Sequence, residues 1–224
     1  MTAAEIGRAW PTFAISLLVN ASALPVRDQG KRGTCLAFAA SGAHGLRLSR
    51  VEVLSPEFLF WAAKQRDGAV HIDGTTPMAV KRALQEIGQP LESKWPYQPT
   101  RPWPLVGYHP PTIAAADLFT RSSTTGSKSL PAVATDALAA GSAPVFALGI
   151  TKAFYRPVGG RVVHVPGQRV EAGHGILAIG YGENEGDPHF LVRNSWGTTW
   201  GMAGHALVPA TYCVEYLRHV LVLD

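Results

Sequence analysis

Residues 25–38 read PVRDQGKRGTCLAF, with Gln29 six residues before Cys35. Small and apolar residues follow at helical spacing up to position 48, so we expect Cys35 to lie in the first turn of a helix capped by Thr34. The free amides and dipole of a helix N-terminus favour an anion, and the thiolate is the reactive form of cysteine. A side-chain amide just upstream can donate to an oxyanion. The segment therefore indicates acyl transfer through a cysteine nucleophile.

Two more polar residues with suitable chemistry follow much later in the chain. His174 lies in AGHGI, residues 172–176, and Asn194 lies in VRNSWGTTWG, residues 192–201. An imidazole can act as the base for a thiol, and an amide oxygen can hold that imidazole in the right orientation. Each of the two residues is expected in a strand or at a strand edge.

The order Gln29, Cys35, His174, Asn194 and the motifs around these residues resemble the papain-like cysteine peptidase family. The likeness is to a disulfide-poor, bacterial-type member without a long propeptide. It implies an α+β, papain-like two-lobe fold, with an N-terminal helical lobe and a C-terminal β-rich, barrel-like lobe. The active site would lie in the cleft between the lobes.

The resemblance also implies a cysteine peptidase that hydrolyses peptide bonds through a Cys35 thioester. His174 would act as acid and base, and Asn194 would orient its ring. Gln29 and the backbone N–H of Cys35 would form the oxyanion hole. Trp196 would shield the hydrogen bond between Asn194 and His174 from water.

Substrate-binding positions are carried over by the same resemblance: Gly33, Gly74, Thr75, Gly173 and Trp196. Thr75 replaces the second glycine of the family's Asn-Gly-Gly-x-Pro motif, and a β-branched residue there is expected to narrow the approach of an extended peptide. Gly173 replaces the usual acidic or Asn neighbour of the histidine, and we expect a looser pocket wall.

Two further departures lie beside Cys35. Leu36 stands where the family usually has Trp, and Arg32 occupies the position of an upstream half-cystine. Neither change touches the proposed chemistry directly.

Each candidate also has an ordinary structural interpretation. Cys35 could be a buried structural thiol, and Gln29 and Asn194 could be turn residues. The sequence contains eight histidines, and a histidine in a strand is more often structural than catalytic. The nearest competitors of His174 are His164, His189 and His205.

Composition is that of a packed globular protein, with 224 residues, 46% hydrophobic and 16% charged. We expect a single catalytic domain over 1–224, divided into a helical lobe at about 25–110 and a β-rich lobe at about 111–224. Residues 1–24 would pack on the β-rich lobe. No cofactor and no metal are expected.

The net charge of +4 comes without any run of Lys or Arg longer than two, which argues against nucleic-acid binding. No stretch is long and apolar enough for a membrane-spanning helix. The expected partners are a peptide or protein substrate and a regulatory protein. With no long propeptide expected before Pro25, the activity would be regulated by such a partner, by restricted access of the substrate to the site, or by a flap at 156–171.

Only two cysteines are present, Cys35 and Cys213, so a nucleophilic Cys35 leaves no intrachain disulfide. This favours a reducing compartment and predicts a cytoplasmic protein. The alternative is a secreted or delivered effector, because the apolar run 13–19 precedes Ala21-Ser22-Ala23, which has the form of a signal cleavage site. The simpler interpretation of 12–19 is a buried first strand.

Local signals divide the chain into a helical first half and a strand-rich second half. Helices are expected at 35–48, after Ser55-Pro56-Glu57, from Thr76-Pro77 to Gly88, and at 130–140 before Gly141. Residues 94–112 are proline-rich and should be irregular, and 122–129 should be a loop. Strands are expected at 144–150, 161–165, 175–181, 190–192, 205–208 and 217–223.

Two other functions remain open. An acyl or amide transferase would use the same Cys-His-Asn site with a non-water acceptor. A catalytically weak binding module would keep the cleft without useful turnover, and Leu36, Thr75 and Gly173 motivate that alternative.

Overall fold

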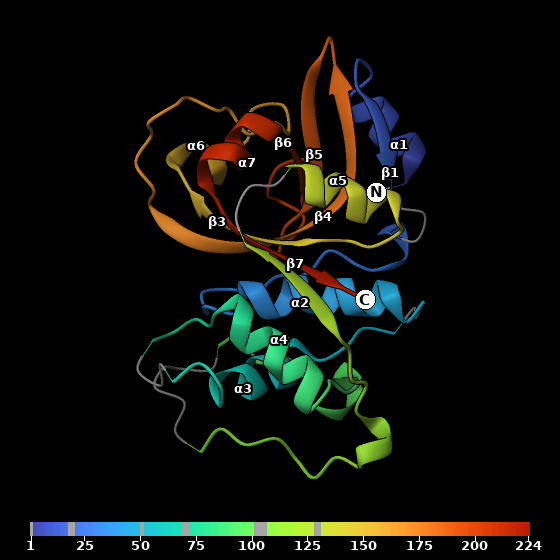
Figure 1. Cartoon of the computed structure of the whole chain (residues 1–224), viewed down its shortest axis with the longest axis vertical. Coiled ribbons are helices and arrows are strands. Elements are labelled where there is room, and N and C mark those ends of the chain that lie inside the picture. Colours follow the sequence, from blue (N-terminus) through green and yellow to red (C-terminus); the bar gives the residue numbers. More distant parts are fainter. Residues whose placement is uncertain (1, 18–20, 50–51, 69–71, 101–106, 128–130) are drawn as a thin grey trace.

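The computed structural model of the chain describes residues 2–17, 21–49, 52–68, 72–100, 107–127 and 131–224. One body contains helices, the other is built on an antiparallel sheet, and α2 (Cys35–Arg47) is the helix of the first body that faces the sheet (Figure 1). This is the α+β architecture predicted from the sequence. No helix in the described ranges has both the length and the apolar character needed to cross a membrane.

The helical body consists of α2, α3 (Pro56–Lys64) and α4 (Pro77–Glu86). The two predicted caps are present: the Ser55 hydroxyl accepts from the Phe58 N–H at 3.0 Å, and the Thr76 hydroxyl accepts from the Ala79 N–H at 3.2 Å. Proline opens both helices, where its missing N–H is not needed.

The start of α2 differs from the prediction in one detail. Thr34 makes no side-chain cap, because its hydroxyl pairs with the Tyr97 hydroxyl at 2.8 Å. The first-turn amides of α2 are therefore not occupied by the residue expected to cap them.

The sheet has the strand order β2-β7-β3-β4-β5-β6, with β1 added on β4, and all its pairings are antiparallel. Its strands are β1 (Ala14–Leu17), β2 (Ser123–Ser127), β3 (Val145–Ile150), β4 (Ala172–Asn184), β5 (Asp187–Arg193), β6 (His205–Pro209) and β7 (Leu217–Leu223). The long β4 pairs with β1, β3 and β5. His174 lies near the start of β4, and Asn194 directly follows β5.

Four short helices accompany the sheet: α1 (Ala3–Ala9), α5 (Pro131–Ala139), α6 (Lys152–Tyr155) and α7 (Ala210–Tyr216). Only α5 was expected. Single-turn 3-10 helices occur at Ala21–Ala23, Glu92–Lys94 and Ala115–Asp117. The described part of 94–112 is otherwise irregular, as its prolines predict.

Two element predictions are wrong. Residues 123–127 form β2 and not a loop, because they pair with β7, and this Ser/Thr/Gly run carries no apolar signal for that distant pairing. The strand expected at 161–165 is absent: Gly160 and Val162 each share one hydrogen bond with Leu207 of β6, no pairing follows them, and Val163 and Val165 are exposed although Val162 is buried. Residues 18–19 and 128–130 of the predicted elements lie outside the described part.

The core has two clusters. One joins the helices to the near face of the sheet and includes Leu59, Phe60 and Leu84, and the other fills the sheet body around Phe146 and Phe190. α2 packs directly on β4. This contact sets the distance between the predicted nucleophile and the predicted base.

Candidate active site

Cys35 is the first residue of α2 and is a free, partly exposed thiol. Burial raises the pKa of this thiol, whereas the backbone N–H groups of Gly175, Leu36 and Cys35 itself act in the opposite direction. Two amides of the first turn of α2 and one amide of β4 thus favour the thiolate, but burial outweighs them and the pKa of Cys35 stays above its ordinary value.

Gly175 allows α2 and β4 to approach closely. A Cβ at this position would lie 2.9 Å from the Cα of Leu36 and 2.8 Å from its Cδ2. By contrast, Gly173 has open space around it and is exposed. Of the two glycines flanking His174, only Gly175 is required by packing.

His174 and Asn194 are directly hydrogen bonded. The distance from Nε2 of His174 to Oδ1 of Asn194 is 2.7 Å, and both residues are buried. The same Oδ1 accepts from the Ser195 N–H at 2.8 Å, which fixes the orientation of the amide. Nε2 therefore donates, and Nδ1 of the neutral ring is the atom left to accept a proton.

Burial dominates the titration of His174. It lowers the pKa of the imidazole to about 4, although the hydrogen bond to Asn194 raises it. The neutral ring is thus the resting form near neutral pH, which is the form that can take a proton from a thiol.

Aromatic rings surround this hydrogen bond. The Trp196 ring centroid lies 4.5 Å from that of His174, and the Phe154 centroid lies 5.8 Å from it. Tyr155 stacks on the outer side of Trp196 at 5.4 Å with an interplanar angle of 10°. Sequence reasoning missed Phe154 and Tyr155, because α6 has only four residues and shows no periodicity.

Gln29 is buried and held by hydrogen bonds of its side chain and its backbone, including one from the Tyr97 hydroxyl to its carbonyl at 2.7 Å. Its Nε2 donates to the Arg32 carbonyl at 2.6 Å, its Oε1 accepts from the Ser195 hydroxyl at 2.6 Å, and its backbone N–H donates to the Ser195 carbonyl at 2.8 Å. Nε2 carries two hydrogens, so one remains after the bond to Arg32. Ser195 was not predicted to have this role, although it adjoins Asn194.

The predicted substrate-binding glycines of the helical body lie together. The Gly33 N–H donates to the Asp73 carboxylate at 3.1 Å, and a Cβ on Gly33 would lie only 2.3 Å from the Asp73 carbonyl oxygen. Gly74 has φ +153°, and its carbonyl accepts from Lys64 at 3.1 Å. Thr75 follows and is partly exposed.

Arg32 forms a buried ion pair with Glu57 of α3, with Nη1 2.6 Å from Oε2 and 3.0 Å from Oε1. Nη1 also donates to the Gln98 carbonyl at 2.8 Å. A charged clamp therefore holds the position at which the sequence resemblance expects a half-cystine.

The competing histidines have other partners. His164 bonds to Thr211 and Glu215, His189 to the Asp187 carbonyl, and His205 to the Ala203 carbonyl. Trp200 is buried, as expected of a core residue. In the described part of the chain, no three His, Cys, Asp or Glu side chains are grouped so that they could hold a metal ion.

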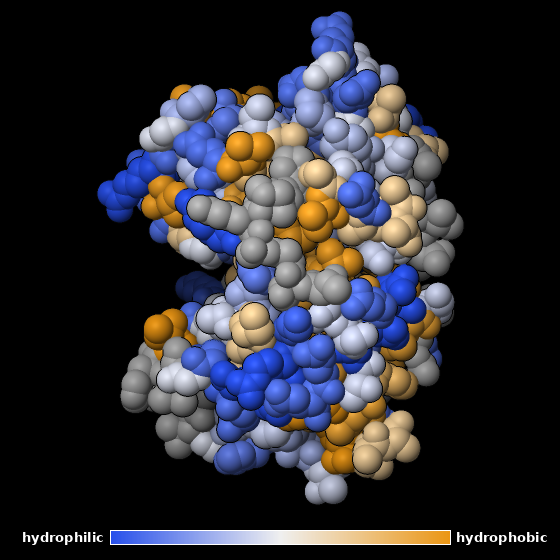
Figure 2. Space-filling view, viewed as in Figure 1, coloured by the Kyte–Doolittle hydropathy of each residue, from blue (hydrophilic) through white to orange (hydrophobic). Residues whose placement is uncertain are grey.

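A notch separates the two bodies at the left of the space-filling view (Figure 2), on the side where α2 begins in Figure 1. Residues 19–213 match the family model described as papain family cysteine protease. The chain belongs to this family. The papain-family resemblance drawn from Cys35, His174 and Asn194 is therefore confirmed.

Among curated relatives, the chain is 32% identical to cathepsin J of Rattus norvegicus over 199 residues, which cover 80% of this chain and 55% of that protein. It is 29% identical to digestive cysteine proteinase 1 of Homarus americanus over 195 residues, covering 81% of this chain and 56% of that one. The chain thus spans about half the length of these relatives.

Solved structures show the same fold. Xylellain, a cysteine protease from Xylella fastidiosa, superposes with a TM-score of 0.76 at 24% identity, covering 89% of this chain and 82% of that one. A Carica candamarcensis cysteine protease in complex with E-64 gives a TM-score of 0.67 at 20% identity, covering 94% and 97%. The predicted two-lobe papain-like fold is confirmed.

Proposed function

We propose that this papain-family chain is a cysteine peptidase that cleaves peptide bonds through a thioester on Cys35. The buried 2.7 Å hydrogen bond between His174 and Asn194 carries the proposal, because it orients an uncharged imidazole on the strand that packs against the start of α2. A structural histidine in a strand would not need an orienting amide, a covering indole and a neighbouring thiol together.

In the first half of the reaction, Nδ1 of His174 takes the proton of the Cys35 thiol, and the sulfur attacks the peptide carbonyl carbon. The carbonyl oxygen becomes an oxyanion that accepts from Nε2 of Gln29 and from the Cys35 N–H. His174 then gives its proton to the leaving nitrogen as the C–N bond breaks, and an amine and a thioester result.

In the second half, water attacks the thioester carbon while His174 accepts a proton from it. The C–S bond breaks, the carboxylic acid product leaves, and the proton returns to the sulfur. At each stage the imidazolium of His174 is balanced by one negative charge, first on the sulfur and then on the oxyanion. This matters because burial opposes a lone charge on either group.

An epoxide-type thiol inhibitor tests the proposal directly. We expect one adduct per chain, on Cys35, and loss of both labelling and peptide cleavage in Cys35→Ala. The matched control is Cys213→Ala: burial raises the pKa of that thiol to about 12, so the variant should keep one label and full activity. Cleavage that persists in folded Cys35→Ala, or no label on the folded wild type, would contradict the proposal.

Product masses from the same digest define the acceptor. Hydrolysis adds one water to each acyl fragment, whereas a transferase would leave the acyl group joined to an amine.

The oxyanion hole is tested by Gln29→Ala, which should lower kcat about a hundredfold, a typical effect for the loss of one oxyanion donor. Unchanged kcat in the folded variant would exclude Gln29 from the oxyanion hole.

We also propose that the protein works in a reducing compartment. The two cysteines are both free, and the Arg32–Glu57 ion pair clamps the segment before Cys35 without sulfur. Reductant should therefore leave the melting temperature unchanged. A disulfide found by intact mass in protein isolated from its source would contradict this proposal.

A further inference from the structure

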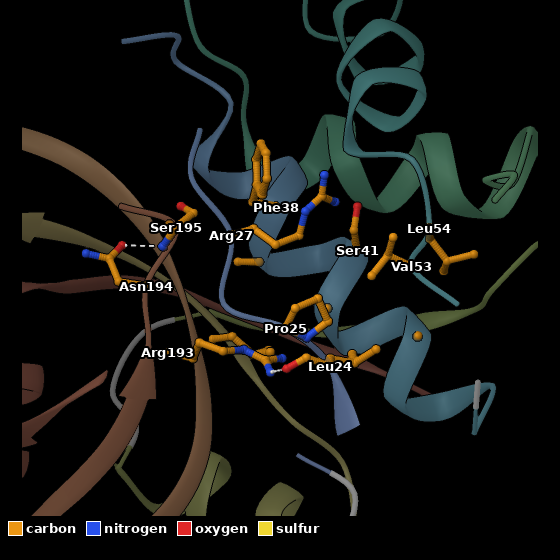
Figure 3. A pocket seen from close by; sticks show the side chains of 15 residues that line it. Leu24, Pro25, Arg27, Phe38, Ser41, Val53, Leu54, Arg193, Asn194 and Ser195 are labelled. Atoms are coloured by element: carbon orange, nitrogen blue, oxygen red, sulfur yellow. Dashed lines mark hydrogen bonds between the residues drawn. The ribbon is translucent and has the colours of Figure 1, made fainter. Parts of the chain in front are cut away.

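Arg193, the last residue of β5, is a buried arginine whose described partners are all neutral. Its Nη1 donates to the carbonyl oxygens of Ala21 at 3.0 Å and Leu24 at 2.9 Å. On the other side, a Cβ on Gly42 of α2 would lie 3.4 Å from Nη2. The guanidinium thus lies where β5, α2 and the segment 21–24 meet (Figure 3).

No acidic group of the chain compensates this charge. Burial lowers the pKa of Arg193 to about 10, and no carboxylate acts against burial. The residues outside the described part contain no Asp or Glu, so none of them can supply the missing partner. With a pKa of about 10 the side chain remains charged near neutral pH, and a buried charge without a counterion costs several kcal/mol.

A cavity of about 40 Å³ adjoins the guanidinium. Its lining contains two arginines and no acid: Leu24, Pro25, Arg27, Phe38, Ala39, Ser41, Gly42, Gly45, Val53, Leu54, Gly175, Leu177, Arg193, Asn194 and Ser195. Arg27 is matched by Glu92 at 2.5 Å, which leaves the charge of Arg193 unmatched. Since one water needs about 10–15 Å³, the space is sufficient for a small ion.

We propose that this cavity, which we call the Arg193 cavity, binds a small monovalent anion such as chloride. The anion would lie beside the guanidinium among largely apolar walls, where a charge pair is screened little by water. It would compensate the only buried guanidinium among the described residues that has no carboxylate partner. Through Arg193 it would stabilise the contact between β5, α2 and the segment 21–24.

Thermal unfolding in different sodium salts tests the proposal. At equal ionic strength, chloride or bromide should raise the Tm of the wild type by about 4 °C over gluconate, which is too large for the cavity, when the halide is at ten times its Kd. Arg193→Gln should unfold at the same temperature in all three salts. Crystals grown in bromide should show an anomalous peak beside the guanidinium.

A second pair of variants keeps Arg193 and so avoids dependence on the folding of Arg193→Gln. Gly45 lies one turn along α2 from Gly42 and lines the same cavity, and its nearest obstacles are the two terminal methyls of Leu24 at 3.3 and 3.7 Å. Gly45→Glu places a carboxylate in the cavity, and Gly45→Gln places an uncharged group of the same shape. In gluconate, Gly45→Glu should melt several degrees above Gly45→Gln and should no longer respond to chloride.

Three results would overturn the proposal. They are a wild-type Tm that is equal in chloride and gluconate, a cavity that contains water but no bromide signal, and equal Tm values for Gly45→Glu and Gly45→Gln. A halide response of the same size in Arg193→Gln would also count against it, because the effect would then not depend on the guanidinium.

Discussion

Two buried arginines lie near the candidate catalytic residues, and only one of them has a carboxylate partner. Arg32 and Arg193 are 6% and 7% exposed. Burial lowers the pKa of Arg32, but Glu57 and, after it, Tyr108 more than offset burial, and the pKa is raised. Nothing offsets burial at Arg193, and its pKa falls to about 10. The partner, and not the depth of burial, decides whether the charge is stabilised.

The surroundings of the two side chains differ in the same way. Around Arg32 the polar groups are paired: Glu57 accepts from Arg32 through both oxygens and from the Gln98 N–H at 3.0 Å. The Arg32 carbonyl also holds Gln29. The Arg193 cavity offers neutral carbonyls and apolar walls. The first region is a completed clamp, and the second is a site that can accept a ligand.

The largest effect is expected when Arg32 is made to resemble Arg193. Glu57→Gln removes the carboxylate of the buried ion pair and leaves the charge of Arg32 uncompensated, so the free energy of unfolding should fall by about 3–5 kcal/mol. Guanidinium denaturation measures it. The double variant Arg32→Met/Glu57→Leu should recover most of the loss, because it leaves no buried charge.

The matched control is Glu86→Gln, which breaks the ion pairs of a half-exposed carboxylate with Arg82 and Arg66 and should lower the free energy of unfolding only slightly. A loss in Glu57→Gln no larger than that in Glu86→Gln would mean that the buried pair stabilises the protein no more than a surface pair does.

Unlike the two arginines, the buried His44 can avoid an uncompensated charge by losing its proton. His44, on α2, is fully buried; burial lowers its pKa to about 4, despite the hydrogen bond to Gln89. Stability should therefore be complete above the unfolded-state pKa of about 6.5 and should be lost as pH falls toward 4, since only the unfolded chain binds the proton there.

For His44 this loss amounts to about 3 kcal/mol. His44→Gln should remove that part of the pH dependence of unfolding, measured from pH 7 to pH 4. An identical pH profile in the variant would show that the burial of His44 does not control acid stability.

A smaller loss is expected when the unpaired arginine itself is removed. Arg193→Met gives up two hydrogen bonds to carbonyls but also removes an uncompensated charge, so in gluconate the free energy of unfolding should fall by only about 1–2 kcal/mol. If the loss equals that of Glu57→Gln, the contrast between the two arginines does not hold.

The smallest effect concerns the segment that Arg32 holds. Ser195→Ala removes the hydroxyl that donates to Gln29 at 2.6 Å, while the bond from Gln29 to the Arg32 carbonyl remains. Under the proposed mechanism kcat should fall about fivefold, or about 1 kcal/mol, with KM unchanged. A change in KM alone would place Ser195 in substrate binding.

Local chemistry explains which features were predictable. Helix caps such as Ser55 and Thr76 depend only on residues close to them in the sequence, and so do the apolar runs of β4 to β7. The motifs around Cys35, His174 and Asn194 are also local. β2 was missed because its order comes from distant pairing with β7. The sequence also did not predict that Arg193 has no carboxylate partner, because this depends on which side chains the fold places near the guanidinium.

The pairing of β4 with three strands also has a consequence for the order of events during synthesis. α2, with Cys35, is synthesised first, whereas β4 and β5 follow it only after more than a hundred further residues. At about 5–20 residues per second, roughly ten seconds or more separate the thiol from its imidazole on the ribosome. Nascent chains would therefore carry an unassisted thiol until the last strands pair. The topology itself thus delays the proposed activity until β4 and β5 have been synthesised and paired.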